Sequence, residues 1–228
     1  MGGVFIVPSP DEIAPMFDAV GIEHDYGDHN AIDAHYRGIR ALSDLLKESM
    51  FDEANIGVWD AYDRAAFVAV GVARAELDAA VAVRHAQRTV NHFVWEHPIT
   101  HNIDAFAQIS MARPVAIVTN NNGTAIDQCR RHGICQIGDG PLPSVPAIVD
   151  SEIVKISKPD PRIFTQALDA LGTDPGRTLY VGDTVHADVL GAAAAGMPVV
   201  QLDPLDLHGD FDHWRLPDVA ALAGHLGA

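Results

Sequence analysis

From about residue 112 onward, short apolar runs alternate with amphipathic segments, and this alternation limits the possible folds more than any other feature of the chain. Such a pattern is typical of buried parallel strands joined by helices. The second half is therefore predicted to form a doubly wound (Rossmann-like) α/β sheet. The expected strands are residues 115–119, 147–149, 178–181 and 198–202, and the expected helices are 123–132, 160–171 and 188–195.

The preceding residues, 11–111, are long amphipathic stretches rich in Ala, Leu, Val and Arg, without strand-like alternation. Three helices are expected there, over 31–48, 52–71 and 75–94. A helical block in front of the rest of a parallel sheet indicates an insertion into an α/β domain, and that insertion requires a first strand before residue 11. We therefore predict a core of residues 1–10 and 112–228 and a helical cap of residues 11–111.

The charge and cysteine content narrow the range of partners and compartments. Lys and Arg number 15 against 31 Asp and Glu, a formal net charge of -16, so nucleic acid and membrane surfaces are poor partners. Two cysteines do not make a disulfide framework, which favours a reducing cytoplasm. The apolar stretch Val4 to Val7 has no basic region before it and Pro8 after it, so it is neither a signal peptide nor a membrane span. A monomer and a homodimer both remain open.

Polar residues follow three of the expected strands, where an open parallel sheet places its ligand site. Thr119 to Gly123, which includes Asn120, offers a hydroxyl and free backbone N–H groups to an anion, although a plain helix cap has the same composition. In Lys158-Pro159-Asp160-Pro161 the last two residues suit the start of a helix. Lys158 is not explained by that helix and would serve as a fixed counter-charge, or else as a solvated loop lysine.

The third strand end carries two acids. Asp183 follows directly on an apolar strand, and Asp188 lies five residues later at the start of the next expected helix. Two converging carboxylates make a hard oxygen site suited to Mg²⁺. Asp188 alone is also compatible with a helix cap, because a helix N-terminus favours carboxylates.

In this order and these strand contexts, the three segments resemble motifs II, III and IV of the haloacid dehalogenase superfamily, and Gly191 to Pro198 looks like the family's stretch after motif IV. The resemblance covers the whole chain, because the helical block looks like the family's C1 cap. It implies a Mg²⁺-dependent hydrolase acting on a small phosphorylated metabolite. The site residues it implies are Thr119 and Lys158 for catalysis, Thr119, Asn120 and Lys158 for phosphate, and Asp183 and Asp188 for the metal.

The chain lacks the aspartate nucleophile of the family's motif I. That motif reads Asp-x-Asp-Gly-Thr or, more loosely, Asp-x-Gly-Gly-Val, whereas the chain begins Met1-Gly2-Gly3-Val4-Phe5. The resemblance places the nucleophile one position before Met1 and the backbone carbonyl of Gly2 on the metal. It also puts Gly2 where the family's phosphatases usually carry the acid/base aspartate, which puts efficient phosphatase activity in doubt.

Two interpretations of this start follow. In the first, the natural protein has a further strand that ends in aspartate before Met1. In the second, Val4 to Val7 is itself the first strand, Val7 takes the place of the nucleophile, and the protein is an inactive pseudoenzyme that binds a phosphorylated ligand. A dehalogenase-like hydrolase, which manages without the acid/base aspartate, is a further alternative. The sheet should therefore show either Val4 to Val7 between the strands of Thr119 and Asp183, or a disruption there.

Overall fold

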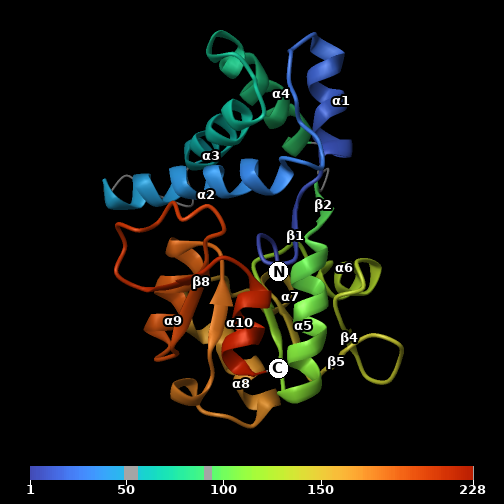
Figure 1. Cartoon of the computed structure of the whole chain (residues 1–228), viewed down its shortest axis with the longest axis vertical. Coiled ribbons are helices and arrows are strands. Elements are labelled where there is room, and N and C mark those ends of the chain that lie inside the picture. Colours follow the sequence, from blue (N-terminus) through green and yellow to red (C-terminus); the bar gives the residue numbers. More distant parts are fainter. Residues whose placement is uncertain (49–55, 90–93, 228) are drawn as a thin grey trace. The chain divides into compact units, whose positions relative to one another are not determined.

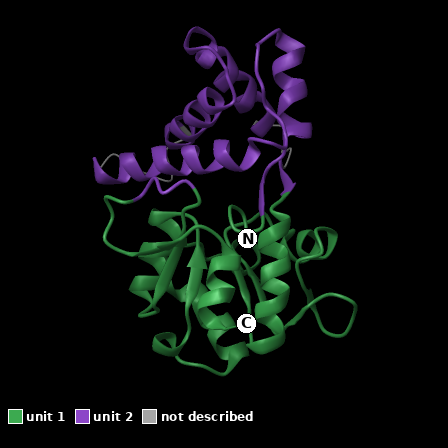
Figure 2. Ribbon diagram, viewed as in Figure 1, with its two compact units in different colours: residues 1–5, 98–204, 209–228 green, residues 6–97, 205–208 purple. Residues whose placement is uncertain are grey.

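The computed structural model describes residues 1–48, 56–89 and 94–227, and its chain divides into two compact units (Figures 1 and 2). The first unit consists of residues 1–5, 98–204 and 209–228, and the second of residues 6–97 and 205–208. Parts of two predicted cap helices, 52–55 and 90–93, lie outside the described residues.

The first unit contains parallel strands in the order along the chain that the apolar runs predict. β3 (Ile117–Thr119) pairs with β6 (Ile148–Asp150), and β7 (Tyr180–Gly182) pairs with β8 (Val199–Leu202), which pairs with β9 (Trp214–Leu216). The short strands β4 (Gln136–Ile137) and β5 (Ser144–Val145) form a separate parallel pair. The α/β fold class is confirmed.

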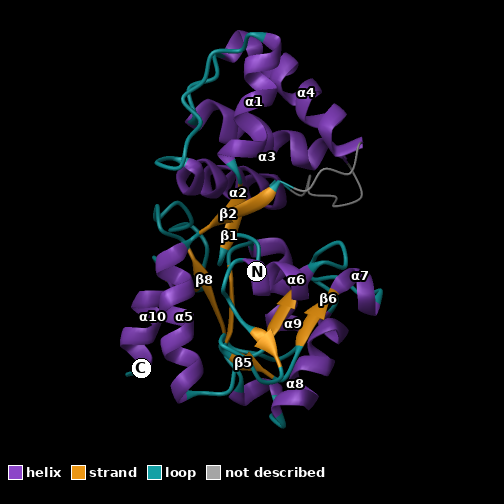
Figure 3. Ribbon diagram, turned by 90° about the vertical axis from the view of Figure 1, so that its right-hand side faces the viewer, coloured by secondary structure: helices purple, strands orange, loops and turns teal. Residues whose placement is uncertain are grey.

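Helices lie on both sides of these strands (Figure 3). α5 and α10 pack against each other on one side, whereas α8 and α9 lie on the other. The helices are α5 (Thr100–Ala112), α6 (Ala125–Arg131), α7 (Ser151–Val154), α8 (Thr165–Leu171), α9 (Leu190–Ala194) and α10 (Val219–Leu226), with the 3-10 turns η2 (Pro161–Phe164) and η3 (Pro175–Arg177) and the π-helical turn η4 (Val185–Val189).

The boundary predicted at residues 111 and 112 is wrong for α5, which belongs to the first unit. Asn102 of this helix donates from Nδ2 to the Val4 carbonyl (2.7 Å) and accepts from the Val219 amide (3.0 Å). A helix that covers a sheet and a helix in a bundle both show one apolar face, so their sequence patterns are alike. The pattern alone therefore could not assign α5 to the core.

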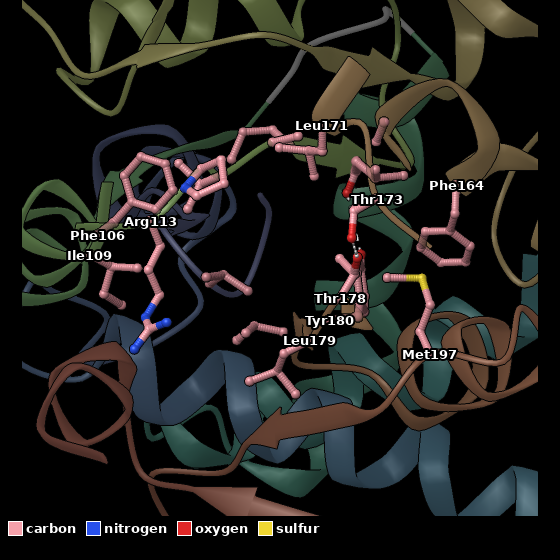
Figure 4. A pocket seen from close by; sticks show the side chains of 18 of the residues that line it. Phe106, Ile109, Arg113, Phe164, Leu171, Thr173, Thr178, Leu179, Tyr180 and Met197 are labelled. Atoms are coloured by element: carbon pink, nitrogen blue, oxygen red, sulfur yellow. Dashed lines mark hydrogen bonds between the residues drawn. The ribbon is translucent and has the colours of Figure 1, made fainter. Parts of the chain in front are cut away.

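The sheet of the first unit is interrupted between β3 and β7, which are not hydrogen-bonded to each other or to a strand between them in the described chain. A cavity of 590 Å³ lies at this place, lined mainly by apolar side chains (Figure 4). Val118 of β3 and Val181 of β7 line it, and so do side chains of both helical layers, such as Phe106 and Phe164. The cavity therefore has the surroundings of a buried central strand.

The disruption expected at this place is confirmed, and the alternative in which Val7 enters the central sheet is wrong. Gly3 has φ 72°, and the Phe5 amide donates to the Met1 carbonyl (2.9 Å), so the chain turns at once. The strand that follows, β1 (Ile6–Pro8), pairs with β2 (Trp95–Pro98) and lies in the second unit. The apolar run therefore adds no strand between β3 and β7, although Val4 and Phe5 line the cavity.

The second unit is a helical bundle with its own apolar core. It contains α1 (Pro10–Val20), α2 (Ala31–Lys47), α3 (Ile56–Ala69), the 3-10 turn η1 (Arg74–Glu76) and α4 (Leu77–Thr89). Phe17, Ile39, Leu42 and Phe67 are among its buried residues. Residues 205–208 join this unit through a hydrogen-bonding contact between His208 Nε2 and Ser43 Oγ (3.1 Å). Within the described ranges, no helix is both long and apolar enough to span a bilayer.

Candidate active site

An ion pair between Lys158 and Asp188 forms the centre of the site in the first unit. Lys158 Nζ lies 2.6 Å from Asp188 Oδ1, and the Tyr180 hydroxyl lies 3.1 Å from Nζ and 3.0 Å from the same carboxylate oxygen. Lys158 is 7% exposed and Asp188 2%. Burial opposes both charges, but the partners outweigh it, so the pKa of Lys158 is raised and that of Asp188 is lowered. Both groups therefore remain charged at neutral pH.

The second oxygen of Asp188 holds the loop that carries Asp183. Asp188 Oδ2 accepts from the Asp183 amide (3.1 Å), the Thr184 amide (3.0 Å) and the Thr184 hydroxyl (2.7 Å). The π-helical turn η4 brings Asp188 back over Gly182, where a Cβ atom would lie 2.3 Å from the Asp188 carboxyl carbon. With five donors on its two oxygens, this carboxylate has used the acceptor capacity of the group. Asp188 thus anchors the loop that carries Asp183, and its assignment as a metal ligand stays a prediction.

Asp183 lies against the first residues of the chain. An ideal Cβ built on Gly3 would stand 2.1 Å from Asp183 Oδ2, so only glycine fits at this position. The amino group of Met1 is close enough to Lys158 and Asp188 for their charges to act on it, and burial lowers its pKa. Residues 1–3, which include Gly2, therefore lie beside the acidic loop, where the resemblance to motif I requires them.

Asn120 connects the end of β3 to Lys158. Its side-chain Nδ2 donates to the Lys158 carbonyl (3.0 Å), and its Oδ1 accepts from the Lys158 amide (2.8 Å). The neighbouring Thr119 is buried at the end of β3. The structure therefore brings Thr119 to Lys158 through Asn120, whose side chain positions the lysine.

The backbone amides of Asn121, Asn122, Gly123 and Ala125 are occupied by the protein itself, which corrects the prediction that these amides are free to bind an anion. Asp150 accepts from the amides of Gly123 (3.0 Å) and Ala125 (3.1 Å), and Ser151 Oγ accepts from the Asn121 amide (3.0 Å). Asp150 pairs with Thr119 in the parallel register, so its carboxylate stands beside the turn. Sequence reasoning missed Asp150 and Tyr180, although each is a polar residue within or at the end of an apolar run.

The donor set around Asp183 fits Mg²⁺, although only in part. Mg²⁺ prefers oxygen ligands and commonly keeps several waters while binding one or two carboxylates. Asp183 would supply one carboxylate, and the main chain of Gly2, next to Gly3, would supply a carbonyl of the same hard character. In the described part of the chain no three His, Cys, Asp or Glu side chains are grouped to hold a metal ion. The remaining ligands would be waters or a second carboxylate.

Replacing Gly3 by alanine is expected to disturb the candidate cation site at Asp183, whereas the same change at Gly21 is not. Both glycines have φ 72°, but nothing lies within 4 Å of a Cβ at Gly21. Gly21→Ala should therefore lower the free energy of unfolding by only the left-handed backbone penalty, about 1–2 kcal/mol. Gly3→Ala should lower it further and weaken Mn²⁺ binding, because the methyl group displaces Asp183. Urea unfolding and Mn²⁺ titration measure both effects, and equal behaviour of the two variants would contradict the contact.

A family model of haloacid dehalogenase-like hydrolases matches residues 14–196 of the chain. The chain belongs to this family. The matched part of this haloacid dehalogenase-like hydrolase includes Thr119, Lys158, Asp183 and Asp188. The membership inferred from the three motifs is thus confirmed.

Curated relatives match only parts of the hydrolase. A phosphoserine phosphatase from Thermus thermophilus is 33% identical over 107 residues, which are 47% of this chain and 41% of the relative. A glyceraldehyde 3-phosphate phosphatase from Methanopyrus kandleri is 42% identical over 55 residues, 24% of each protein. The chain therefore spans less than half the length of these relatives.

Solved structures share the fold of the hydrolase over nearly its whole length. The HAD-hydrolase YfnB from Bacillus subtilis has a TM-score of 0.60 at 19% identity, covering 98% of this chain and 94% of that one. L-2-haloacid dehalogenase from Xanthobacter autotrophicus has a TM-score of 0.53 at 11% identity, covering 97% and 94%. At these identities the likeness shows the fold alone.

Proposed function

We propose that this hydrolase is a Mg²⁺-dependent phosphatase of a small phosphorylated metabolite, and that its nucleophile is an aspartate directly before Met1. The observation that carries the proposal is the position of residues 1–3, which lie against Asp183 and beside the Lys158–Asp188 pair. A residue attached to Met1 would enter the same cluster. The phosphatase names of the curated relatives support phosphoryl chemistry, and the structure of YfnB bound to magnesium supports the choice of cation.

Different residues of the chain would bind the phosphoryl group and the metal ion in such a reaction. Lys158, fixed by Asp188 and by the side chain of Asn120, holds a positive charge for the phosphoryl group. Thr119 would contribute its hydroxyl, and Asn120 its main chain, because its side chain is already bound to Lys158. Asp183 and the Gly2 carbonyl would hold Mg²⁺, which when bound neutralises developing negative charge on the phosphoryl oxygens.

The interrupted sheet supports a strand before Met1. A parallel strand in the 590 Å³ cavity would pair with the facing edges of β3 and β7 and would cover its apolar lining. Five residues would span about 16 Å at the usual rise of a strand. A peptide bond at Met1 would also replace a buried amino group by a neutral amide, which removes the cost of burying that charge.

A phosphatase assay of a form extended by an apolar strand and aspartate tests this function. We expect Mg²⁺-dependent hydrolysis of small phosphomonoesters, lost in EDTA. The rate should be at least about 10-fold lower in Asp183→Asn, because even residues that only orient a metal ligand commonly change activity by that much when replaced. Equal rates for Asp183→Asn and its parent would contradict the mechanism. Because Gly2 replaces the usual acid/base aspartate, 2-chloropropionate belongs in the same panel, and chloride release without phosphate release would favour a dehalogenase.

A further inference from the structure

Gln201 is a fully buried polar residue in an otherwise apolar strand. It lies in β8 between Val200 and Leu202, and all three side chains are 0% exposed. A primary amide without partners in such a place would cost several kcal/mol relative to water. The partners that satisfy Gln201 therefore indicate what this residue does.

The two ends of the Gln201 amide have different partners. Nε2 donates to the main-chain carbonyl of Asp183 (2.8 Å), and Oε1 lies 2.6 Å from His213 Nε2. A carbonyl can only accept, so the NH₂ group must face Asp183 and the oxygen must face His213. His213 then carries its proton on Nε2 and fixes the orientation of the amide.

The hydrogen bond from Gln201 to the Asp183 carbonyl lies directly beyond the end of the pairing between β7 and β8. Gly182 is the last residue of β7 and pairs with Gln201 in the register of β8. Asp183 comes next and has left the ladder, but its carbonyl is bound by Gln201 and its amide by Asp188 Oδ2. The peptide groups on both sides of Asp183 are thus held, which fixes the direction in which its side chain leaves the main chain.

We propose that Gln201 is a positioning residue that sets the affinity of Asp183 for a divalent cation, with His213 holding the Gln201 amide in place. This proposal rests on the proposed function, because it takes Asp183 as a cation ligand. Without Gln201 the Asp183 carbonyl would lose this hydrogen bond inside the protein, and a peptide that turned to replace it would redirect the carboxylate. Partners that orient a metal ligand from behind commonly change metal affinity 10–100-fold when they are replaced.

Mn²⁺ binding to the chain of 228 residues, followed by electron paramagnetic resonance, tests the proposal. We expect Gln201→Leu to raise the Kd for Mn²⁺ about tenfold or more. Gln136→Leu is the matched control, because Gln136 is also a buried strand glutamine, 6% exposed, but binds the Gly138 carbonyl and the Leu142 amide. This control should leave the Kd within about twofold, although it loses hydrogen bonds of the same kind.

Two further variants keep the outcome readable if Gln201→Leu folds poorly. His213→Leu should weaken Mn²⁺ binding, and His213→Gln should restore it, because glutamine can again donate to Gln201. Hydrogen exchange at the Asp183 and Thr184 amides should be faster in Gln201→Leu and unchanged in Gln136→Leu, with or without a cation. This exchange is a direct measure of how firmly the loop is held.

The reference variant Asp183→Asn distinguishes a failure of the positioning role of Gln201 from a failure of the cation site itself. If Asp183→Asn abolishes Mn²⁺ binding and Gln201→Leu leaves both the Kd and the exchange unchanged, the positioning role is wrong and the cation site stands. If Asp183→Asn binds Mn²⁺ as the parent does, the cation site of the proposed function is wrong, and the proposal for Gln201 falls with it.

Discussion

If the proposed function holds, a form of the protein with an apolar strand and an aspartate before Met1 hydrolyses a small phosphomonoester about 10⁶-fold faster than the same form with asparagine there. Aspartate supplies the attacking carboxylate, whereas asparagine has nearly the same shape and cannot attack as efficiently. The chain that begins at Met1 should be as slow as the asparagine form. Initial rates of phosphate release under saturating Mg²⁺ measure the difference.

The stability of the two extended forms separates strand insertion from catalysis. Both forms should fill the cavity lined by Val118, Val181 and the facing helices and should complete the ladders of β3 and β7. At about 25 cal/mol per Å² of buried apolar surface, one strand contributes several kcal/mol. We therefore expect both forms to melt at least about 5 °C above the chain that begins at Met1.

The melting temperatures test whether the added strand enters the sheet, and the rates test whether the aspartate is the nucleophile. Extended forms that are no more stable than the chain beginning at Met1 would show that this segment does not enter the interrupted sheet. Extended forms that gain stability while the aspartate and asparagine versions are equally slow would contradict the phosphatase proposal and favour a protein that binds a phosphorylated ligand without catalysis. The strand and the chemistry are thus tested independently.

The strands and their polar ends were predictable because one local rule governs both. A buried parallel strand reads as an apolar run, and the first polar residue after it stands at the carboxyl edge of the sheet. Thr119 and Asp183 both follow this rule, and β3 and β7 end within one residue of the predicted positions. The same rule could not assign α5 to the first unit, because the sequence of an amphipathic helix does not show whether its apolar face packs on a sheet or on other helices.

The hydrogen-bonding role of Asp188 could not be read from spacing. Its position at the start of an expected helix fits both a cap and a metal ligand, and the choice depends on where Lys158 and Tyr180 lie in space. The π-helical turn η4 adds one residue to the turn and aims the carboxylate back at the Asp183 amide, where an α-helix was expected. Long-range partners and local helix type therefore decided the role.

Breaking the Lys158–Asp188 pair should destabilise the first unit strongly. Both groups are nearly inaccessible, with side-chain exposures of 8% and 3%, so removing Lys158 leaves Asp188 as a buried charge without its counter-charge. Lys158→Met is therefore expected to lower the free energy of unfolding by about 3–5 kcal/mol. Lys155→Met is the matched control, because Lys155 pairs with Glu152 at side-chain exposures of 70% and 56% and should lose less than about 1 kcal/mol.

A double variant shows whether the lost free energy of unfolding comes from the Lys158–Asp188 ion pair itself. Lys158→Met combined with Asp188→Leu removes both charges, so its loss should be smaller than the sum of the two single losses, measured by urea unfolding. The remaining loss should be large all the same, because Asp188 also holds the amides of Asp183 and Thr184. A Lys158→Met variant that unfolds at the same urea concentration as Lys155→Met would mean that the ion pair with Asp188 does not stabilise the fold. The site would then lack the fixed charge that the proposed function requires for phosphate binding.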